Sequence, residues 1–149
     1  VALAVGAGLA GSAGPAAALS ERIVRDDYTG LALGGYDPVA YFLDGRARPG
    51  VDAHEVAALG VFWRFVNAGN AAAFAAAPAA YVPAYGGYSA VSVAEGYPAP
   101  GRPELFVVTG NRLYLFRSEA QRAAFLADPA AVIAAADAHW PEIERTLSP

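Results

Sequence analysis

The sequence predicts a small α+β domain in which small antiparallel sheets carry helices packed on one side. Three observations favour this fold class. Short stretches alternate between apolar and polar residues, as half-buried strands do. Alanine-rich stretches that hold a single bulky aromatic residue follow them, as expected of helices lying close to a sheet. One pattern of glycine, proline and aromatic residues also occurs twice. The 149 residues suffice for one domain with a hydrophobic core.

Composition excludes several classes of protein and of site. Charged residues make up only 16% of the chain and hydrophobic residues 56%, which argues against intrinsic disorder. The net charge of −4, without a basic cluster, argues against nucleic acid as a partner. The chain contains no cysteine and no lysine. Disulfides, thiolate metal sites, Schiff-base chemistry and a phosphate-binding P-loop are therefore excluded.

The first 19 residues resemble the second half of a secretory signal peptide. Residues 1–10 are apolar, Gly14 and Pro15 interrupt the stretch, and residues 16–18 provide small side chains at the spacing of a cleavage site. The alternative is a membrane anchor, but four glycines and a proline make a poor span. We therefore expect residues 1–19 to be a signal-peptide remnant and residues 20–149 to form the domain. The protein would then be periplasmic or secreted, with no stable membrane span after signal removal.

The domain sequence contains an internal tandem repeat. Gly34-Gly35-Tyr36 matches Gly86-Gly87-Tyr88 at a spacing of 52 residues, and after a one-residue slip the spacing holds at 51. The pairs in this second register are Trp63 with Tyr114, Phe65 with Phe116, Asn67 with Ser118, Phe74 with Phe125, and Pro78 with Pro129. The sequence therefore predicts a tandem repeat of a strand–hairpin–helix unit, with repeat one at about 34–82 and repeat two at about 86–133.

Each repeat predicts the same elements in the same order. A Gly-Gly turn opens a strand at 36–42 or 88–94, and an acidic residue followed by glycine makes the next turn. A second strand follows, poorly defined near 55–58 and clear at 105–109. After a tight turn, a strand with alternating aromatic residues occupies 61–65 or 112–116.

Helix start signals come directly after the aromatic strands. Asn67 is the expected N-cap in the first repeat, and Ser118 with Gln121 forms a capping box in the second. Asp128 and Pro129 have the types of an N-cap and first helical residue, so a C-terminal helix is expected over about 129–147. Within it we expect Pro141 to end the main helix after about residue 138, with a last helical turn beyond.

In combination these motifs resemble the YHS-domain family, especially its exported bacterial single-domain members. The resemblance is carried by GGYDPVAYF at 34–42, His54-Glu55 ahead of GVFWRF at 60–65, YGGY at 85–88 and ADAHWP at 136–141. It covers about residues 34–141. The resemblance implies a small α+β domain related to treble-clef metal-binding modules, and copper-type metal handling.

The chain departs from the family pattern at a chemically important position. Exported members usually have cysteine, or selenocysteine, after Tyr-Gly-Gly-Tyr, whereas this chain has Ser89. A serine hydroxyl is neither a soft metal ligand nor a redox nucleophile. Asn67 stands in place of the serine of the family name, and His139 precedes Trp-Pro where asparagine is usual.

Three residues are candidate metal ligands. His54 is the first, because neutral imidazole is a common ligand for copper and zinc; the alternative is a partly buried histidine bonded to backbone at a strand edge. Asp37 is the second, and the alternative is an Asx turn that caps neighbouring N–H groups. His139 is the third, and the alternative is a surface histidine near a helix C-terminus.

The tyrosines suggest a binding groove. If the repeats are related by a two-fold axis, Tyr36 and Tyr88 occupy equivalent positions facing one groove, with Tyr41 and Tyr85 nearby and Ser89 lining it. The alternatives are that the tyrosines form the amphipathic part of the core and that Ser89 is an inert buried replacement.

No catalytic motif occurs in the sequence, with no G-x-S-x-G and no H-E-x-x-H. We expect an exported non-enzymatic protein that binds a copper or zinc ion, or a small molecule, in the tyrosine-lined groove. One alternative is a degenerate scaffold or partner domain that binds no metal. A redox enzyme is the other, and the absence of a thiol disfavours it.

Overall fold

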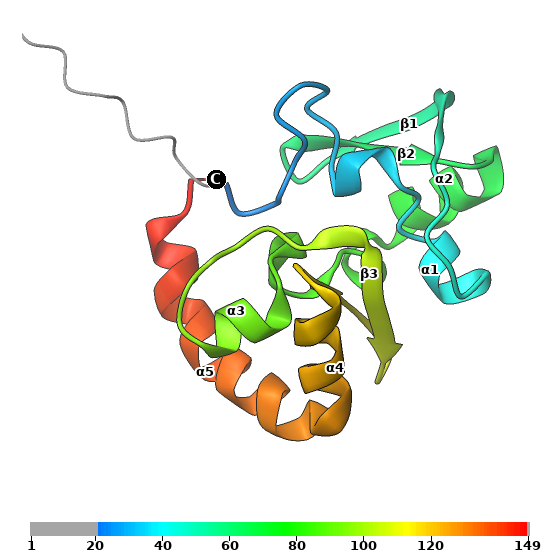
Figure 1. Cartoon of the computed structure of the whole chain (residues 1–149). Coiled ribbons are helices and arrows are strands. Elements are labelled where there is room, and N and C mark those ends of the chain that lie inside the picture. The colour runs from blue at the N-terminus through cyan, green and yellow to red at the C-terminus, as the bar shows by residue number, and fades with distance from the viewer. Residues whose placement is uncertain (1–20, 149) are drawn as a thin grey trace, which may run out of the picture.

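The computed structural model describes residues 21–148 and has an α+β architecture, which confirms the predicted class (Figure 1). Two separate two-stranded antiparallel sheets are each followed by helices. The helices are α1 (Ala40–Leu43), α2 (Ala68–Ala76), α3 (Ala90–Ala94), α4 (Glu119–Ala127) and α5 (Pro129–Thr146). The strands are β1 (Val51–Ala58), β2 (Val61–Phe65), β3 (Arg102–Thr109) and β4 (Arg112–Phe116), and the short 3-10 turns are η1 (Leu33–Gly35), η2 (Pro78–Ala80) and η3 (Ala84–Gly87). The expected signal-peptide remnant lies outside the described residues.

The two hairpins have the same strand register. Val56 pairs with Trp63 in the first hairpin, and Val107 pairs with Tyr114 in the second. Each first strand contains a register shift at the corresponding place, between Val51 and Glu55 and between Arg102 and Phe106. Each hairpin turns through two residues of positive φ, Leu59 and Gly60 in the first and Gly110 and Asn111 in the second. Two such residues are what a tight turn needs to match the twist of its flanking strands.

The helices that follow the hairpins begin at the predicted caps. The Asn67 side chain accepts a hydrogen bond from the Asn70 N–H at 2.8 Å, and the Ser118 hydroxyl accepts one from the Gln121 N–H at 3.2 Å. Each helix then buries one phenylalanine against its own hairpin. The rings of Phe74 and Trp63 are 4.9 Å apart. The N-caps and aromatic anchors confirm these predictions, but the capping box is only half formed, because Gln121 Oε1 accepts from the Arg117 N–H and not from that of Ser118.

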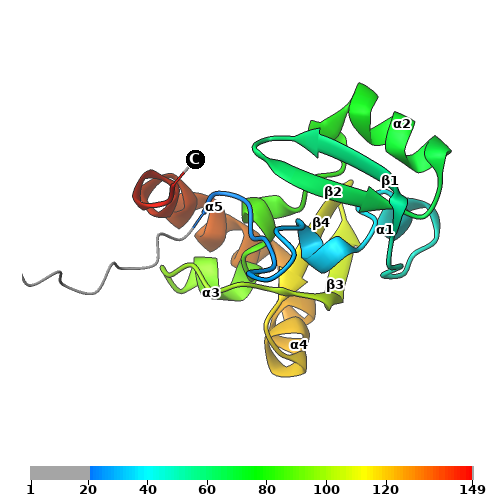
Figure 2. The same cartoon turned by 90° about the horizontal axis from the view of Figure 1, so that it is seen from above.

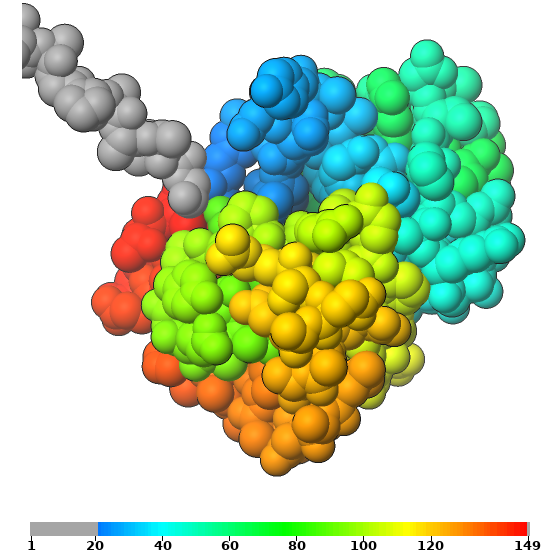
Figure 3. Space-filling view, viewed as in Figure 1, coloured from blue at the N-terminus to red at the C-terminus, as the bar shows by residue number. Residues whose placement is uncertain are grey.

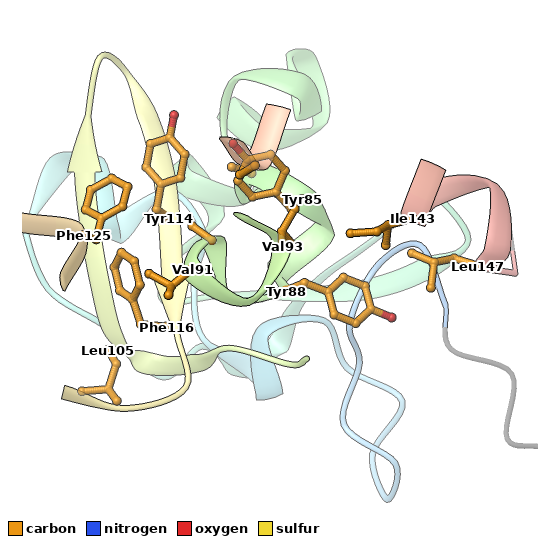
Figure 4. Packing of buried hydrophobic residues seen from close by; sticks show 13 residues of the cluster. Tyr85, Tyr88, Val91, Val93, Leu105, Tyr114, Phe116, Phe125, Ile143 and Leu147 are labelled. Atoms are coloured by element: carbon orange, nitrogen blue, oxygen red, sulfur yellow. The ribbon is translucent and has the colours of Figure 1, made fainter. Parts of the chain in front are cut away.

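The buried residues form two clusters, one for each half of the chain. The first contains Trp63, Phe65 and Phe74, and the second contains their counterparts Tyr114, Phe116 and Phe125 together with residues of α3 and α5 (Figure 4). Leu113 and Leu115 of β4 belong to the first cluster, although their strand lies in the second half. The strand β4 is therefore buried on both faces, with one face in each cluster.

Two element predictions were wrong. The expected strands at 36–42 and 88–94 do not form; isolated bridge residues, Tyr36 in the first half and Tyr88 with Ser89 in the second, follow the 3-10 turn η1 or η3 and precede the short helix α1 or α3. In the first half the Asp37 side chain accepts hydrogen bonds from the next backbone N–H groups, which starts a helical turn where the apolar residues suggested a strand.

The C-terminal helix also differs from expectation. It begins at the predicted residue, with the Asp128 side chain accepting from the Ala131 N–H at 3.1 Å, but α5 continues through Pro141 to Thr146. Trp140 packs against the second cluster and Ile143 is buried in it, so tertiary packing on both sides of the proline outweighs the lost backbone hydrogen bond.

The segment before η1 ties the two halves together. The Val24 N–H donates to the Gly86 carbonyl at 2.8 Å, and the Ala32 N–H donates to the Phe62 carbonyl at 2.9 Å. A Cβ atom on Gly86 would lie 1.8 Å from the Arg22 carbonyl oxygen, so only glycine allows this approach. Figure 2 shows the hairpin β1–β2 with α2 at one end of the molecule, away from α4. Among the described residues, no helix is both long and apolar enough to cross a membrane.

Candidate functional site

Asp37 is fully buried and its two oxygens accept four hydrogen bonds. Oδ1 accepts from the Val39 N–H at 2.8 Å and from the Ala40 N–H at 3.2 Å. Oδ2 accepts from the Val66 N–H at 2.9 Å and from Asn70 Nδ2 at 2.7 Å. The carboxylate therefore joins the start of α1 to the end of β2 and the start of α2. These contacts are those of the turn-capping alternative, and they occupy the lone pairs that a metal ion would need.

Ser89 takes part in an equivalent network in the second half. Its hydroxyl donates to Gln121 Oε1 at 2.7 Å, and the same oxygen accepts from the Arg117 N–H at 3.2 Å. Gln121 Nε2 donates to the Ser92 hydroxyl at 3.1 Å. Ser89 is fully buried and lies inside the network.

Asn70 and Gln121 were missed as functional residues by the sequence analysis. Both are amides at the third helical position of α2 and α4, 51 residues apart, and each bonds a buried polar residue that follows a Gly-Gly-Tyr motif. In the first half the Asp37 carboxylate is the acceptor and the Asn70 amide donates to it. In the second half the roles are reversed, because the Gln121 amide oxygen is the acceptor and the Ser89 hydroxyl donates to it. Pairing the amides in the 51-residue register was the signal that would have found them.

The two histidines lie in different halves. His54 is half-buried on β1, next to the register shift, and His139 is exposed on α5. His139 Nδ1 lies 3.0 Å from the Ala94 carbonyl oxygen at the end of α3. Within residues 21–148, no group of three or more histidine, aspartate or glutamate side chains is placed to hold a metal ion.

The predicted site tyrosines point to four different partners. The Tyr36 hydroxyl donates to Glu104 Oε1 at 2.9 Å, and the Tyr41 hydroxyl donates to the Pro103 carbonyl at 2.8 Å. The Tyr85 hydroxyl donates to Asp137 Oδ1 at 2.8 Å, and the Tyr88 hydroxyl donates to the Glu21 carbonyl at 2.5 Å. The first two tie the first half to β3, Tyr85 ties η3 to α5, and Tyr88, directly after η3, binds the N-terminal segment. The structure thus places these tyrosines as connections between elements and does not gather them around one groove.

Burial and acidic neighbours raise the pKa of several of these hydroxyls. Desolvation is the main cause of the raised pKa at Tyr41, Tyr85 and Tyr114, while the hydrogen bond to Glu104 is the main cause of the raised pKa at Tyr36. Each of these hydroxyls stays protonated in the folded protein at a pH where an unfolded tyrosine ionises.

We expect the protein to lose stability as the pH rises above about 10. Above that pH the unfolded chain releases tyrosine protons that the folded chain retains, so the folded state binds more protons and the free energy of unfolding falls. Below pH 10 both states are protonated and these groups contribute no pH dependence. For buried Tyr41 alone the expected slope is about −1.4 kcal/mol per pH unit.

Urea denaturation at a series of alkaline pH values measures this slope. In Tyr41→Phe the pH dependence above 10 should be weaker than in the wild type. Ionisation of all eight tyrosines near pH 10 in a chain that keeps its native circular dichroism would contradict the prediction.

A groove lies where the two Gly-Gly turns and the N-terminal segment meet. Its inner part is a cavity of about 160 Å³ lined by Val24, Arg25, Asp26, Leu33, Gly34, Gly87, Gly101, Pro103 and Leu115. Its outer part, about 590 Å³, shares Val24, Arg25 and Asp26 with it and reaches Tyr88, Pro98 and Pro100. In Figure 3 the surface is hollowed between the blue N-terminal segment and the yellow-green stretch near residue 100. We call this the Gly34–Gly87 groove.

Two charged residues of the groove, Arg25 and Asp26, bind other groups of the protein, and a third, Asp27, lines its outer part. Arg25 forms an ion pair with Glu21. Asp26 Oδ1 accepts hydrogen bonds from the N–H groups of Tyr28 and Thr29 and from the Thr29 hydroxyl, and the bond from the Thr29 N–H is the main cause of a lowered pKa at Asp26. Within residues 21–148, every buried side-chain nitrogen and oxygen has a hydrogen-bond partner. The groove therefore offers apolar walls and glycine backbone, with the paired Arg25, the hydrogen-bonded Asp26 and the carboxylate of Asp27 at its rim.

Comparison with known proteins gives no relative for this chain: no family model, no curated protein and no solved structure matches it. The resemblance to the YHS-domain family stays a prediction from the motifs of the sequence.

Proposed function

We propose that the protein is a non-enzymatic binding protein whose Gly34–Gly87 groove takes the apolar part of a small molecule. The observation that carries this proposal is the inner cavity of about 160 Å³, with walls formed by Val24, Leu33, Pro103 and Leu115. An enclosed apolar cavity of about 150 Å³ binds benzene, so this partly open pocket has room for a molecule of that size. Small-ligand sites typically combine such apolar walls with few polar groups at the rim.

Export and membership of the YHS-domain family with its treble-clef-like fold remain part of the proposal. The apolar stretch at 1–19 supports export. The ordered motifs between 34 and 141 support the family, and the short α+β elements around paired Gly-Gly turns fit a small domain of that kind.

The proposal also includes that the two halves are copies of one unit. β3, β4 and α4 each begin and end 51 residues after β1, β2 and α2. The strand registers, the positions of the register shifts and the two positive-φ turn residues agree at the same spacing. The buried networks of Asp37 and Ser89 occupy equivalent places, which supports a common origin more strongly than matched apolar residues do.

A small molecule is favoured over a metal ion because the candidate ligands are occupied or isolated. Asp37 accepts four hydrogen bonds, and Ser89 is buried within its own network. A copper or zinc site at His54 is the alternative. Titration with each ion separates the two: binding tighter than about 10 µM, or about −7 kcal/mol, that disappears in His54→Ala would favour the metal.

Ligand-observed NMR with benzene and indole as probes tests the groove. We expect a dissociation constant near 1 mM, or about −4 kcal/mol, and magnetisation transfer to the methyl groups of Val24, Leu33 and Leu115. Val24→Phe should abolish the transfer because the larger side chain fills the inner cavity. Val51→Phe on β1, where the native residue is exposed and outside the groove, is the matched control and should bind as the wild type does. Equal probe binding by the Val24 variant would show that the ligand sits elsewhere.

The scaffold alternative is favoured by a different observation, an exposed apolar surface at the turn of the first hairpin. Leu59 and Phe62 are both more than half exposed there. This surface shares no lining residue with the Gly34–Gly87 groove and leads to a proposal of its own.

A further inference from the structure

The turn of the first hairpin, residues 57–62, is entirely apolar apart from its backbone. Its sequence is AALGVF, and Leu59 and Phe62 are 58% and 55% exposed. The same six residues line a surface concavity of about 390 Å³. We call residues 57–62 the hairpin end. Large exposed apolar side chains gathered in one place are typical of an interaction surface.

Leucine is an unfavourable residue at position 59 of this turn if the protein is a monomer. Its φ is +57°, in the left-handed region where a branched aliphatic side chain is strained by about 1–2 kcal/mol. The equivalent residue of the second hairpin is Gly110, which carries no such strain, and Asn111 follows it. Because Leu59 is exposed, burial within the chain does not offset its strain. The second hairpin shows that the same turn forms with residues that suit it.

The two hairpins also differ in what covers their outer faces. Side chains alternate along a strand, so Phe62 and Arg64 share one face of β2, and Leu113 and Leu115 share the equivalent face of β4. Leu113 and Leu115 are 0% and 1% exposed because the first half of the chain packs on them. The same face of the first hairpin carries half-exposed Phe62. The face that is covered in the second hairpin is therefore exposed to solvent in the first.

The charges on this open face are balanced. Arg64 Nε donates to Glu55 Oε1 at 2.7 Å, and Glu55 stands opposite Arg64 in the strand register, so both side chains lie on the face that bears Phe62. The strand face, with one internal ion pair, meets a copy of itself without like-charge repulsion, and Arg22 is the one further charge beside the turn that has no ion pair among the described residues. Contacts across a two-fold axis are reciprocal, so any contact of the carboxylate in one copy with the guanidinium of the other occurs twice.

We propose that the hairpin end is a dimer interface, in which Leu59 and Phe62 pack against the same residues of a second copy of this chain. The occupant is a second copy because the face is self-complementary in charge and continues the mode of packing that already covers the second hairpin. Aromatic and aliphatic residues at the centre of such a face, with an ion pair at its rim, have the composition of an interface core. Figure 2 shows that the hairpin lies at an edge of the molecule, where a partner has access to it.

Sedimentation velocity of the full chain between about 1 µM and 500 µM tests the proposal. The wild type should change from monomer to dimer within this range, and Phe62→Ser should weaken the dimer at least tenfold. Leu59→Asn should weaken it to a similar degree while keeping or raising the melting temperature, because asparagine tolerates positive φ. This pairing separates loss of association from loss of fold. Leu126→Ser on α4, where the native residue is 52% exposed, is the control and should dimerise as the wild type does.

The absence of cysteine allows a direct test of proximity. Ala57 stands opposite Phe62 in the register and is exposed, so Ala57→Cys should form a disulfide-linked dimer under mild oxidation. Ala124→Cys on α4 should remain mostly monomeric. A wild type that is monomeric throughout the range overturns the proposal. Unchanged dimerisation of Phe62→Ser also overturns it, because association would then come from another surface or from residues 1–20. Probe binding in the Gly34–Gly87 groove is measured separately, so either proposal can fail alone.

Discussion

Asp37→Ala is expected to lower the free energy of unfolding by about 4 kcal/mol. The substitution removes a fully buried acceptor and leaves the N–H groups of Val39, Ala40 and Val66 and the amide of Asn70 without their partner. Each orphaned buried donor costs about 1–3 kcal/mol, although solvent entering the cavity recovers part of this. Urea denaturation followed by tryptophan fluorescence measures the loss, which is a large part of the 5–15 kcal/mol typical of a domain.

Two substitutions act as controls for Asp37. Ser89→Ala, at the equivalent position, should cost only about 1 kcal/mol, because Gln121 Oε1 keeps its bond from the Arg117 N–H. Asp44→Ala removes an exposed ion pair with Arg48 and should cost less than about 1 kcal/mol. The double variant Asp37→Ser/Asn70→Gln copies the second network into the first half and should recover part of the loss seen in Asp37→Ser. If the double variant is less stable than Asp37→Ser alone, the two networks are not equivalent.

Leu113→Ala is expected to cost about 3 kcal/mol, whereas Phe62→Ala should cost less than about 1 kcal/mol in the monomer. The two residues occupy the same register position of their hairpins, but Leu113 is 0% exposed within the first cluster and Phe62 is 55% exposed. The cavity left by the leucine side chain accounts for most of the difference.

The regions that Leu113→Ala destabilises show whether Leu113 supports the core of the first half or only its own hairpin. Because Leu113 belongs to the hairpin of the second half and to the core of the first, amide hydrogen exchange should accelerate around Trp63 and Phe74 as well as along β4. Acceleration confined to β3 and β4 would contradict the shared core. Equal losses of stability for Leu113→Ala and Phe62→Ala would contradict the difference in cover between the two hairpins.

Local signals in the sequence predicted the elements that depend on local interactions. The aromatic strands β2 and β4, the caps Asn67, Ser118 and Asp128, and the anchors Phe74 and Phe125 all follow from spacing and side-chain type. The strand predicted after the first Gly-Gly turn was wrong because the side-chain hydrogen bonds of Asp37 determine the conformation there. Two of those bonds come from Val66 and Asn70, about thirty residues away. Pro141 failed as a helix end because packing of Trp140 and Ile143 outweighed it.

Less of the candidate site than of the fold could be predicted from the sequence. The tyrosine hydroxyls bond to partners 52 to 68 residues distant, and no pattern in the chain names those partners. The walls of the Gly34–Gly87 groove come from glycines, a proline and the N-terminal segment, which carry no chemical signature of a site. Phe62 and Leu113 look alike in sequence, because both are apolar residues in alternating strands. Only the three-dimensional packing shows that one is covered and the other is open.

The double burial of β4 has a consequence for the order in which the chain acquires structure. A polypeptide leaves a ribosome or a translocation pore with its N-terminal end first, so the first half emerges before Leu113 and Leu115 are available. Its core then lacks two of its buried side chains, and its hairpin and α2 remain incompletely packed until β4 has emerged. Folding of the two halves is thereby coupled in time. A stop codon placed before residue 112 is expected to yield no stable fragment, even though every residue of the first half would be present.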